Sequence, residues 1–95
     1  MSFEHQSVLV EEVIAALSPR SGGLYCDGTA GGGGHLARIL AVPGTRAIGI
    51  DRDPAALAAA RVKAPGARLV HARYSELASV LEGTQADGIL LDLGV

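Results

Sequence analysis

The glycine run at residues 31–34 constrains this chain more than any other feature of its sequence. It lies within the segment 27–35, Asp-Gly-Thr-Ala-Gly-Gly-Gly-Gly-His, which follows the short apolar stretch Leu24–Cys26. Glycine lets the backbone turn sharply and approach a ligand without a Cβ atom in the way. A strand, a glycine loop and the start of a helix together favour binding of an oxygen-rich or anionic group, although they do not name it.

Short apolar strands and helices alternate along the rest of the chain. The predicted strands are 24–26, 46–50, 68–71 and 86–91, and the predicted helices are 8–17, 36–41, 55–63 and 75–81. We expect Ser7 to cap the first of these helices and Asp53, which precedes a proline, to cap the third. This alternation predicts βαβ units, hence a parallel sheet with helices on both faces. Because aromatic residues are only 3 % of the chain, the helices should pack close to the sheet.

Residues 1–95 are expected to form one domain, since no repeat, linker or second compositional block interrupts them. A doubly wound sheet normally has two halves, and this length supplies little more than the first. We therefore expect the N-terminal part of a Rossmann-like α/β domain, truncated, with no second domain.

Composition narrows the possible partners. The net charge of −2 excludes a generally basic nucleic-acid arm. The single cysteine, Cys26, excludes an internal disulfide, and no Cys/His cluster has the spacing of a zinc site. The longest strictly aliphatic run, 89–91, is too short to span a membrane, and the N-terminus lacks the order of a signal peptide. A cytoplasmic protein with no metal and no membrane contact is expected.

Three classes of ligand suit a glycine loop, and the sequence separates them. A P-loop requires Gly-Lys-Ser/Thr, but the only lysine is Lys63. A dinucleotide remains open, because Gly32–Ala37 fits the G-x-G-x-x-A pattern and Asp51 follows Gly32 by 19 positions. S-adenosylmethionine requires an acid near the loop for its cationic end, which Asp27 supplies. It also requires an acid after the second strand for its ribose, which Asp51 supplies.

Asp27 bears on the choice between the last two ligands, a dinucleotide and S-adenosylmethionine. A carboxylate at the entrance of the loop repels a pyrophosphate and attracts an ammonium and a sulfonium, which favours S-adenosylmethionine. Asp92 follows the fourth strand and adds a third acid. Because parallel strands end at one edge of the sheet, we expect Asp27, Asp51 and Asp92 to face one crevice.

Several segments, in this order, resemble the N-terminal third of the bacterial RsmH (MraW) family. They are His5–Leu9, Gly23–Thr29, Gly31–His35, Gly49–Pro54 and Asp87–Val95. This family contains S-adenosylmethionine-dependent enzymes that methylate the exocyclic N4 of a cytidine in the decoding region of 16S ribosomal RNA. The resemblance implies the same cofactor and reaction, with the small-subunit RNA bound mostly by regions outside this chain.

The resemblance also implies roles for individual residues. Gly33, Gly34 and His35, with Gly31 beside them, would line the methionine end of the cofactor. Asp51 would bind the ribose. Tyr74, where the family usually has phenylalanine, would pack beside the adenine. Asp92 would lie near the sulfonium. It is also the candidate catalytic residue, because we expect either Asp92 or a backbone carbonyl in the loop after it to accept a hydrogen bond from the target amine.

The sequence departs from the family in two ways. Gln6 and Ser7 follow His5 where the family usually has a Pro or Thr-type residue, and family members are much longer than 95 residues. Two other interpretations therefore stay open beside the methyltransferase. One is a dinucleotide-binding module of an oxidoreductase. The other is an inactive fragment that self-associates through the edge of the fourth strand.

Overall fold

Four parallel strands form one sheet in the computed structural model, which describes residues 3–91 and the side chains of 10–91. The strands are β1 (Leu24–Asp27), β2 (Arg46–Asp51), β3 (Arg68–His71) and β4 (Gly88–Leu90). Their order is β3-β2-β1-β4, so the chain winds outward from β1 to β3 and then returns to the other side of β1. Ligands of open α/β sheets bind at such a reversal, beyond the carboxyl ends of the strands.

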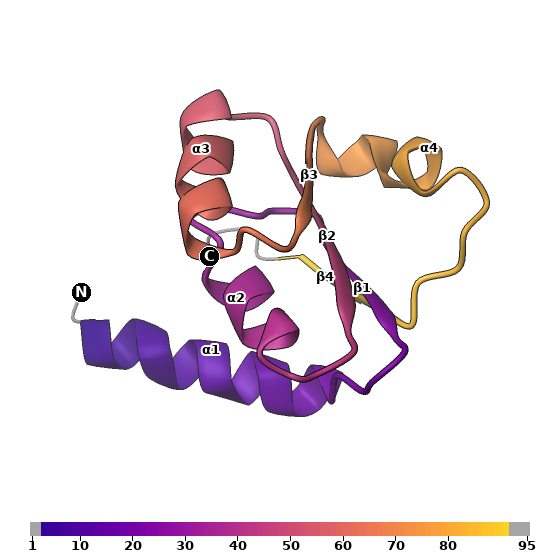
Figure 1. The fold of residues 1–95 in the computed structure, drawn as a ribbon. Coiled ribbons are helices and arrows are strands. Elements are labelled where there is room, and N and C mark those ends of the chain that lie inside the picture. Colours follow the sequence, from indigo (N-terminus) through magenta and orange to yellow (C-terminus); the bar gives the residue numbers. More distant parts are fainter. Residues whose placement is uncertain (1–2, 92–95) are drawn as a thin grey trace.

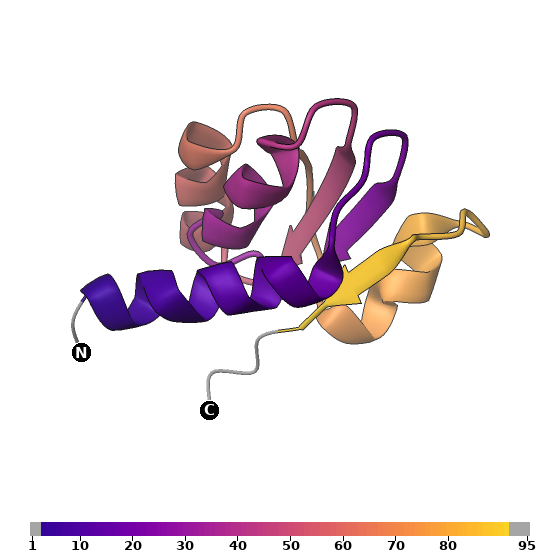
Figure 2. The same cartoon turned by 90° about the horizontal axis from the view of Figure 1, so that it is seen from below.

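Helices cover both faces of the sheet, as the sequence predicts. They are α1 (Phe3–Leu17), α2 (Gly34–Leu40), α3 (Pro54–Lys63) and α4 (Leu77–Leu81), and the short 3-10 helix η1 (Tyr74–Glu76) precedes α4. Figure 1 shows α2 and α3 on one side of the sheet and α4 on the other. Seen from below, α1 runs along the α2 side of the molecule (Figure 2).

The hydrophobic core has two parts, one on each face. The cluster under α2 contains Tyr25, Ala30, Leu36, Ile39, Ala47 and Ala64, and the cluster under α4 contains Leu24, Cys26, Ile48 and Ile50. Successive strand residues point to opposite faces. Asp27, two positions after Tyr25, therefore lies on the α2 side. The last residue of β2, Asp51, lies on the same side, because Gly49 two positions earlier contacts Leu36 of α2.

Small residues bring the helices close to the sheet. A Cβ atom on Gly49 would collide with Leu36 Cδ1 and would lie 3.1 Å from Leu69 Cδ2 and 3.2 Å from Ala30 Cβ. Glycine at this position lets α2 approach β2, which agrees with the close packing that the low aromatic content predicts.

Several predicted boundaries are wrong. The first helix begins at Phe3 rather than Val8, so Ser7 lies inside it and is not its cap; no glycine or proline interrupts this segment. Helix α2 begins two residues earlier than predicted, at Gly34. Strand β4 covers 88–90 rather than 86–91, because it pairs only with the end of the four-residue β1.

Ser75 does not begin an α-helix as predicted, because it lies in η1. The Glu76 carboxylate accepts a hydrogen bond from the Arg73 N–H at 2.9 Å and so caps this turn. By contrast, Asp53 caps α3 as predicted, since its Oδ1 accepts from the Ala55 N–H at 2.9 Å.

Candidate functional site

The segment 28–33, called the glycine loop below, crosses the carboxyl end of the central strand. The Gly28 N–H donates to the Leu90 carbonyl of β4 at 2.9 Å, and the Ala30 N–H donates to the Ile50 carbonyl of β2 at 2.8 Å. The Gly33 N–H closes the loop by donating to the Ala30 carbonyl at 2.9 Å. The loop is therefore attached to both neighbours of β1, at the edge where the strand order reverses.

Gly33 has a conformation and a contact that only glycine allows. Its φ is +87°, in the left-handed region, and it precedes the first residue of α2. A Cβ atom here would lie 2.8 Å from Ala60 Cα of α3. The glycine run thus serves the packing of the loop against α3 in addition to any ligand.

Asp27 lies underneath the loop rather than on an open rim. Its side chain is fully buried, its Oδ1 accepts from the Thr29 N–H at 2.9 Å, and its Oδ2 is 4.0 Å from His35 Nδ1. The His35 side chain, in the first turn of α2, is 15 % exposed. The expectation that Asp27 faces the crevice directly is corrected in this respect: its carboxylate is fully buried, and His35 lies beside it.

Asp51 connects β2 to the glycine loop. Its Oδ2 accepts from the Gly31 N–H at 2.9 Å, and its Oδ1 accepts from the Asp53 N–H at 2.9 Å. Each carboxylate oxygen can accept two hydrogen bonds, so both keep capacity for a ligand hydroxyl. The side chain is partly exposed, which is compatible with the ribose-binding role predicted for it.

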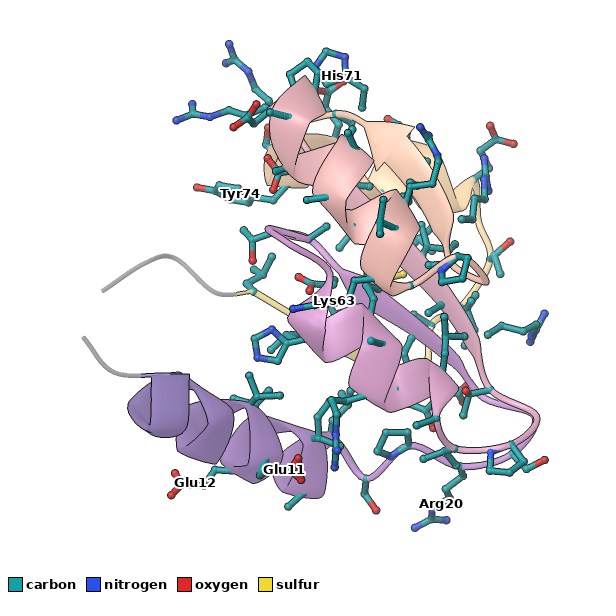
Figure 3. All side chains as sticks on the ribbon, turned by 60° about the vertical axis from the view of Figure 1, so that its left-hand side comes forward. Glu11, Glu12, Arg20, Lys63, His71 and Tyr74 are labelled. Atoms are coloured by element: carbon teal, nitrogen blue, oxygen red, sulfur yellow. The ribbon has the colours of Figure 1, made fainter. Side chains whose placement is uncertain are left out.

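Two exposed apolar side chains lie next to Gly28. Tyr74, in η1 after β3, is 52 % exposed and projects outward (Figure 3), and Leu91, after β4, is 45 % exposed. A Cβ atom on Gly28 would collide with Leu91 Cδ2 and would lie 3.4 Å from Tyr74 Cβ. Sequence reasoning proposed Tyr74 but missed Leu91. The position of Leu91 at the end of the fourth strand, two residues after Ile89, could have indicated that it lies at the carboxyl edge of the sheet.

Some predicted residues fall elsewhere. Asp92 lies outside the described residues, so its catalytic and binding roles stay predictions; the side chain of His5 also lies outside them.

Cys26 is buried, and this burial, together with the neighbouring Asp27 carboxylate, raises the pKa of its thiol. A raised pKa leaves less thiolate, which agrees with a structural rather than nucleophilic cysteine.

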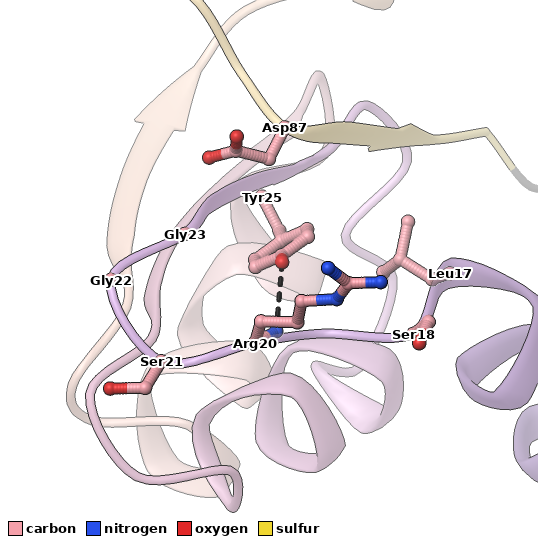
Figure 4. A pocket seen from close by; sticks show the side chains of 8 residues that line it. All are labelled: Leu17, Ser18, Arg20, Ser21, Gly22, Gly23, Tyr25 and Asp87. Carbon is pink, nitrogen blue, oxygen red and sulfur yellow. Dashed lines mark hydrogen bonds between the residues drawn. The ribbon is translucent and has the colours of Figure 1, made fainter.

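The opposite end of the sheet contains a hollow, which lies away from the predicted chemistry (Figure 4). It is lined by Leu17, Ser18, Arg20, Ser21, Gly22, Gly23, Tyr25 and Asp87. The Tyr25 hydroxyl accepts from the Arg20 N–H at 2.8 Å, and Asp87 Oδ2 accepts from the Leu24 N–H at 2.8 Å. These contacts connect the amino ends of the strands, so Asp87 lies away from the carboxyl edge.

Neither a metal centre nor a membrane span is found in the described part of the chain. Among the side chains that the structure describes, those of residues 10–91, no three His, Cys, Asp or Glu are grouped so that they could hold a metal ion. Over residues 3–91, no helix has the length and apolar character needed to cross a membrane.

The architecture matches that of solved structures. An RNA methyltransferase from Salinibacter ruber, in complex with S-adenosyl-L-homocysteine, matches 87 % of this chain and 56 % of its own with a TM-score of 0.71 at 19 % identity. Precorrin 8w decarboxylase from Methanobacterium thermoautotrophicum matches 96 % of this chain and 48 % of its own with a TM-score of 0.74 at 14 % identity. The fold is the Rossmann-like fold of S-adenosylmethionine-dependent methyltransferases.

Sequence comparison narrows this class to one family. The profile of the MraW methylase family matches residues 2–95. Ribosomal RNA small subunit methyltransferase H of Heliobacterium mobile is 51 % identical over 105 residues, and that of Sorangium cellulosum is 50 % identical over 99. These matches cover 100 % and 97 % of this chain. The chain belongs to the MraW methylase family, and it spans about a third of the length of these relatives, 34 % and 31 %.

Proposed function

We propose that this chain is the cofactor-binding part of an S-adenosylmethionine-dependent methyltransferase of small-subunit ribosomal RNA. The observation that carries the proposal is the position of Asp51, in a member of the MraW methylase family. This carboxylate ends β2, holds the glycine loop through the Gly31 N–H, and keeps acceptor capacity at the edge where the strand order reverses.

The residues around Asp51 fit the parts of S-adenosylmethionine. The ribose hydroxyls would donate to Asp51, and the adenine would lie against the exposed faces of Tyr74 and Leu91 beside Gly28. Gly33, Gly34 and His35 would line the methionine end. The relative from Salinibacter ruber, which carries S-adenosyl-L-homocysteine, is consistent with a ligand of this class on the shared fold.

The glycine loop suits a sulfonium nucleoside better than a dinucleotide. The N–H groups of Gly28, Thr29, Ala30, Gly31 and Gly33 all donate to acceptors of the protein itself. A pyrophosphate would need such donors, and it would lie on the face of the sheet that carries the Asp27 and Asp51 carboxylates. These contacts argue against the oxidoreductase alternative.

The proposed reaction transfers a methyl group to the N4 atom of a cytidine in the decoding region. The cofactor supplies a methyl group that its sulfonium has already activated, so the protein chiefly orients the amine and excludes water. We assign Asp92 the role of accepting a hydrogen bond from the amine N–H. The target base has to leave its stack to reach this edge.

Most contacts with the RNA are assigned to regions outside this chain. The net charge of −2 offers little attraction to a phosphate backbone. Because ribosomal subunits are its proposed substrate, we place the protein in the cytoplasm.

A titration tests the cofactor assignment. Calorimetry of the 95-residue chain with S-adenosylhomocysteine is expected to give saturable binding, and the same titration with NADH is expected to give none. Binding of NADH alone would instead support the oxidoreductase alternative.

With small ribosomal subunits and labelled S-adenosylmethionine, the 95-residue chain should leave the RNA unlabelled, whereas a full-length relative should label it.

We also propose that the isolated chain self-associates through β4. Among the residues that the structure describes, this strand pairs with β1 alone, and it carries Ile89, which is 51 % exposed. An open strand edge with an exposed apolar side chain favours pairing with another strand. Sizing chromatography should show a concentration-dependent dimer, and Ile89→Lys should shift it toward the monomer; a monomer at all concentrations would reject this proposal.

A further inference from the structure

The buried carboxylate of Asp27 is oriented from two directions. Its Oδ1 accepts from the Thr29 N–H at 2.9 Å, and its Oδ2 faces His35 Nδ1 at 4.0 Å. The carboxylate is fully buried and the His35 side chain is 85 % so, which leaves little water to screen the contact between them. One oxygen thus belongs to the glycine loop, and the other faces the ring at the start of α2.

A carboxylate at this distance bears on which ring nitrogen of His35 carries the proton. An ionised carboxylate only accepts hydrogen bonds, so its field favours a proton on the nitrogen that faces it. In a neutral imidazole, a proton on Nδ1 leaves the lone pair on Nε2. Nε2 lies on another edge of the ring and is then an acceptor.

We propose that Asp27 is a positioning residue that holds His35 as the Nδ1–H tautomer, so that Nε2 accepts a hydrogen bond from a cationic amine bound at the glycine loop. The identity of that amine, the ammonium of the methionine moiety, rests on the proposed function. Asp27 then strengthens binding of the cationic end of the ligand through His35, although Asp27 itself does not contact the ligand.

His71 supplies an internal control with the opposite tautomer. Its Nε2 lies 2.9 Å from the Arg52 carbonyl oxygen, which can only accept, so Nε2 carries the proton in this ring. The two histidines should therefore differ in one spectrum of one sample.

Long-range proton–nitrogen NMR of the 95-residue chain without ligand, at mildly alkaline pH, measures this difference. We expect the Nδ1–H form for His35 and the Nε2–H form for His71. In Asp27→Asn, the amide oxygen can still accept from the Thr29 N–H, while the positive end of the amide NH₂ would face Nδ1 and favour a lone pair on that nitrogen. His35 should then change to the Nε2–H form and His71 should not. An Nε2–H tautomer of His35 in the unsubstituted chain would overturn the proposal without any variant.

Binding of S-adenosylhomocysteine tests the consequence. Asp27→Asn is expected to weaken it roughly tenfold, and the same substitution in a His35→Gln background should add little, because both act through one ring. Asp87→Asn, at the other end of the sheet, is the matched control and should leave binding unchanged. Additive effects of Asp27→Asn and His35→Gln would overturn the proposal. If no variant and no parent chain binds the ligand, the proposed function fails, whereas the tautomer result still decides the role of Asp27.

Discussion

The dipeptide Asp-Gly occurs at both ends of the sheet, and its carboxylate has a different environment and role at each end. Asp27-Gly28 ends β1, and its carboxylate is fully buried beneath the glycine loop. Asp87-Gly88 begins β4, and its carboxylate is exposed and accepts from the Leu24 N–H. Both glycines are crowded, Gly28 by Leu91 and Gly88 by Leu17 and Tyr25.

The difference comes from position along the strand rather than from residue type. At the carboxyl end, β2, β4 and the loop converge on the end of β1, so an acid there is enclosed and can act on a neighbouring side chain. At the amino end, the connecting turn 18–23 leaves a hollow, and the acid only joins two strands. If this comparison is right, substitutions at the carboxyl end affect ligand binding, and their counterparts at the amino end affect stability alone.

The largest effect is expected from Gly33→Ala. Alanine is strained at a φ of +87°, and its Cβ would lie 2.8 Å from the backbone of Ala60, which cannot easily move. We expect a loss of about 3 kcal/mol in the free energy of unfolding, measured by urea denaturation.

Two other glycines sharpen this measurement. Gly44, near the amino end, also has a positive φ, of +82°, but its Cβ would meet the Ser21 side chain, which can rotate. Gly44→Ala should therefore cost less, about 1–2 kcal/mol. Gly32→Ala, with no heavy atom within 4 Å, should cost less than about 1 kcal/mol. Equal losses at Gly33 and Gly44 would show that the contact with the Ala60 backbone adds nothing to the strain of a positive φ.

Asp51→Ala should weaken binding of S-adenosylhomocysteine tenfold or more, as measured by calorimetry. It removes the proposed ribose acceptor and the acceptor of the Gly31 N–H, and it should also cost about 1 kcal/mol of stability. Asp87→Ala removes the acceptor of the Leu24 N–H and should cost a similar stability with no change in affinity. An unchanged affinity in Asp51→Ala would remove this residue from the site.

Tyr74→Ala should weaken ligand binding about threefold to tenfold, because the adenine would lose an aromatic surface. The change in stability should be small, since about half of this side chain is exposed in the absence of ligand. Tyr74→Phe keeps the ring and should bind as the parent chain does. If the alanine variant binds equally well, Tyr74 only covers the edge of the sheet.

Cys26 lies within β1, between the two ends of the sheet, and its substitution should change stability less than the others do. Because its pKa is raised in the folded chain, the thiol stays protonated there at a pH where the unfolded chain has lost this proton. The unfolded state then binds fewer protons, so stability should fall as the pH rises through the ordinary pKa of a thiol. Cys26→Ala should abolish this fall, which urea denaturation at several pH values would measure; a rise with pH in the parent chain would contradict the assigned direction.

Much of the fold could be predicted from local sequence patterns, because short apolar runs mark the strands and residues next to proline or glycine mark the ends of helices. Strand β3 has the predicted bounds, 68–71, and Asp53 caps α3 as its position before a proline indicates. The limits of β4 could not be predicted, because the length of β1 determines how many of its residues find a partner. The start of α1 was missed because a good capping residue, Ser7, can equally lie inside a helix.

The positions of two candidate acids along their strands could be predicted from the sequence, but the depth at which one of them lies could not. The sequence places Asp27 and Asp51 at the ends of parallel strands, and both lie on the α2 side of the sheet. Asp27 is enclosed because α2 lies close to β1. This closeness depends on contacts between residues that are distant in the sequence, so local patterns do not reveal it. Leu91 was missed for a similar reason, because its neighbours Gly28 and Tyr74 are distant in the sequence.

The pairing of β1 with β4 has a consequence for synthesis of the protein. Leu24 and Asp87 are joined by a hydrogen bond across 63 positions. At the usual rate of translation, β1 leaves the ribosome several seconds, on the order of 3–13 s, before its neighbour exists. During that interval one edge of the central strand is bare, and the Gly28 N–H awaits the Leu90 carbonyl. The nascent chain is therefore most vulnerable to mispairing along the side of β1 that β4 later covers.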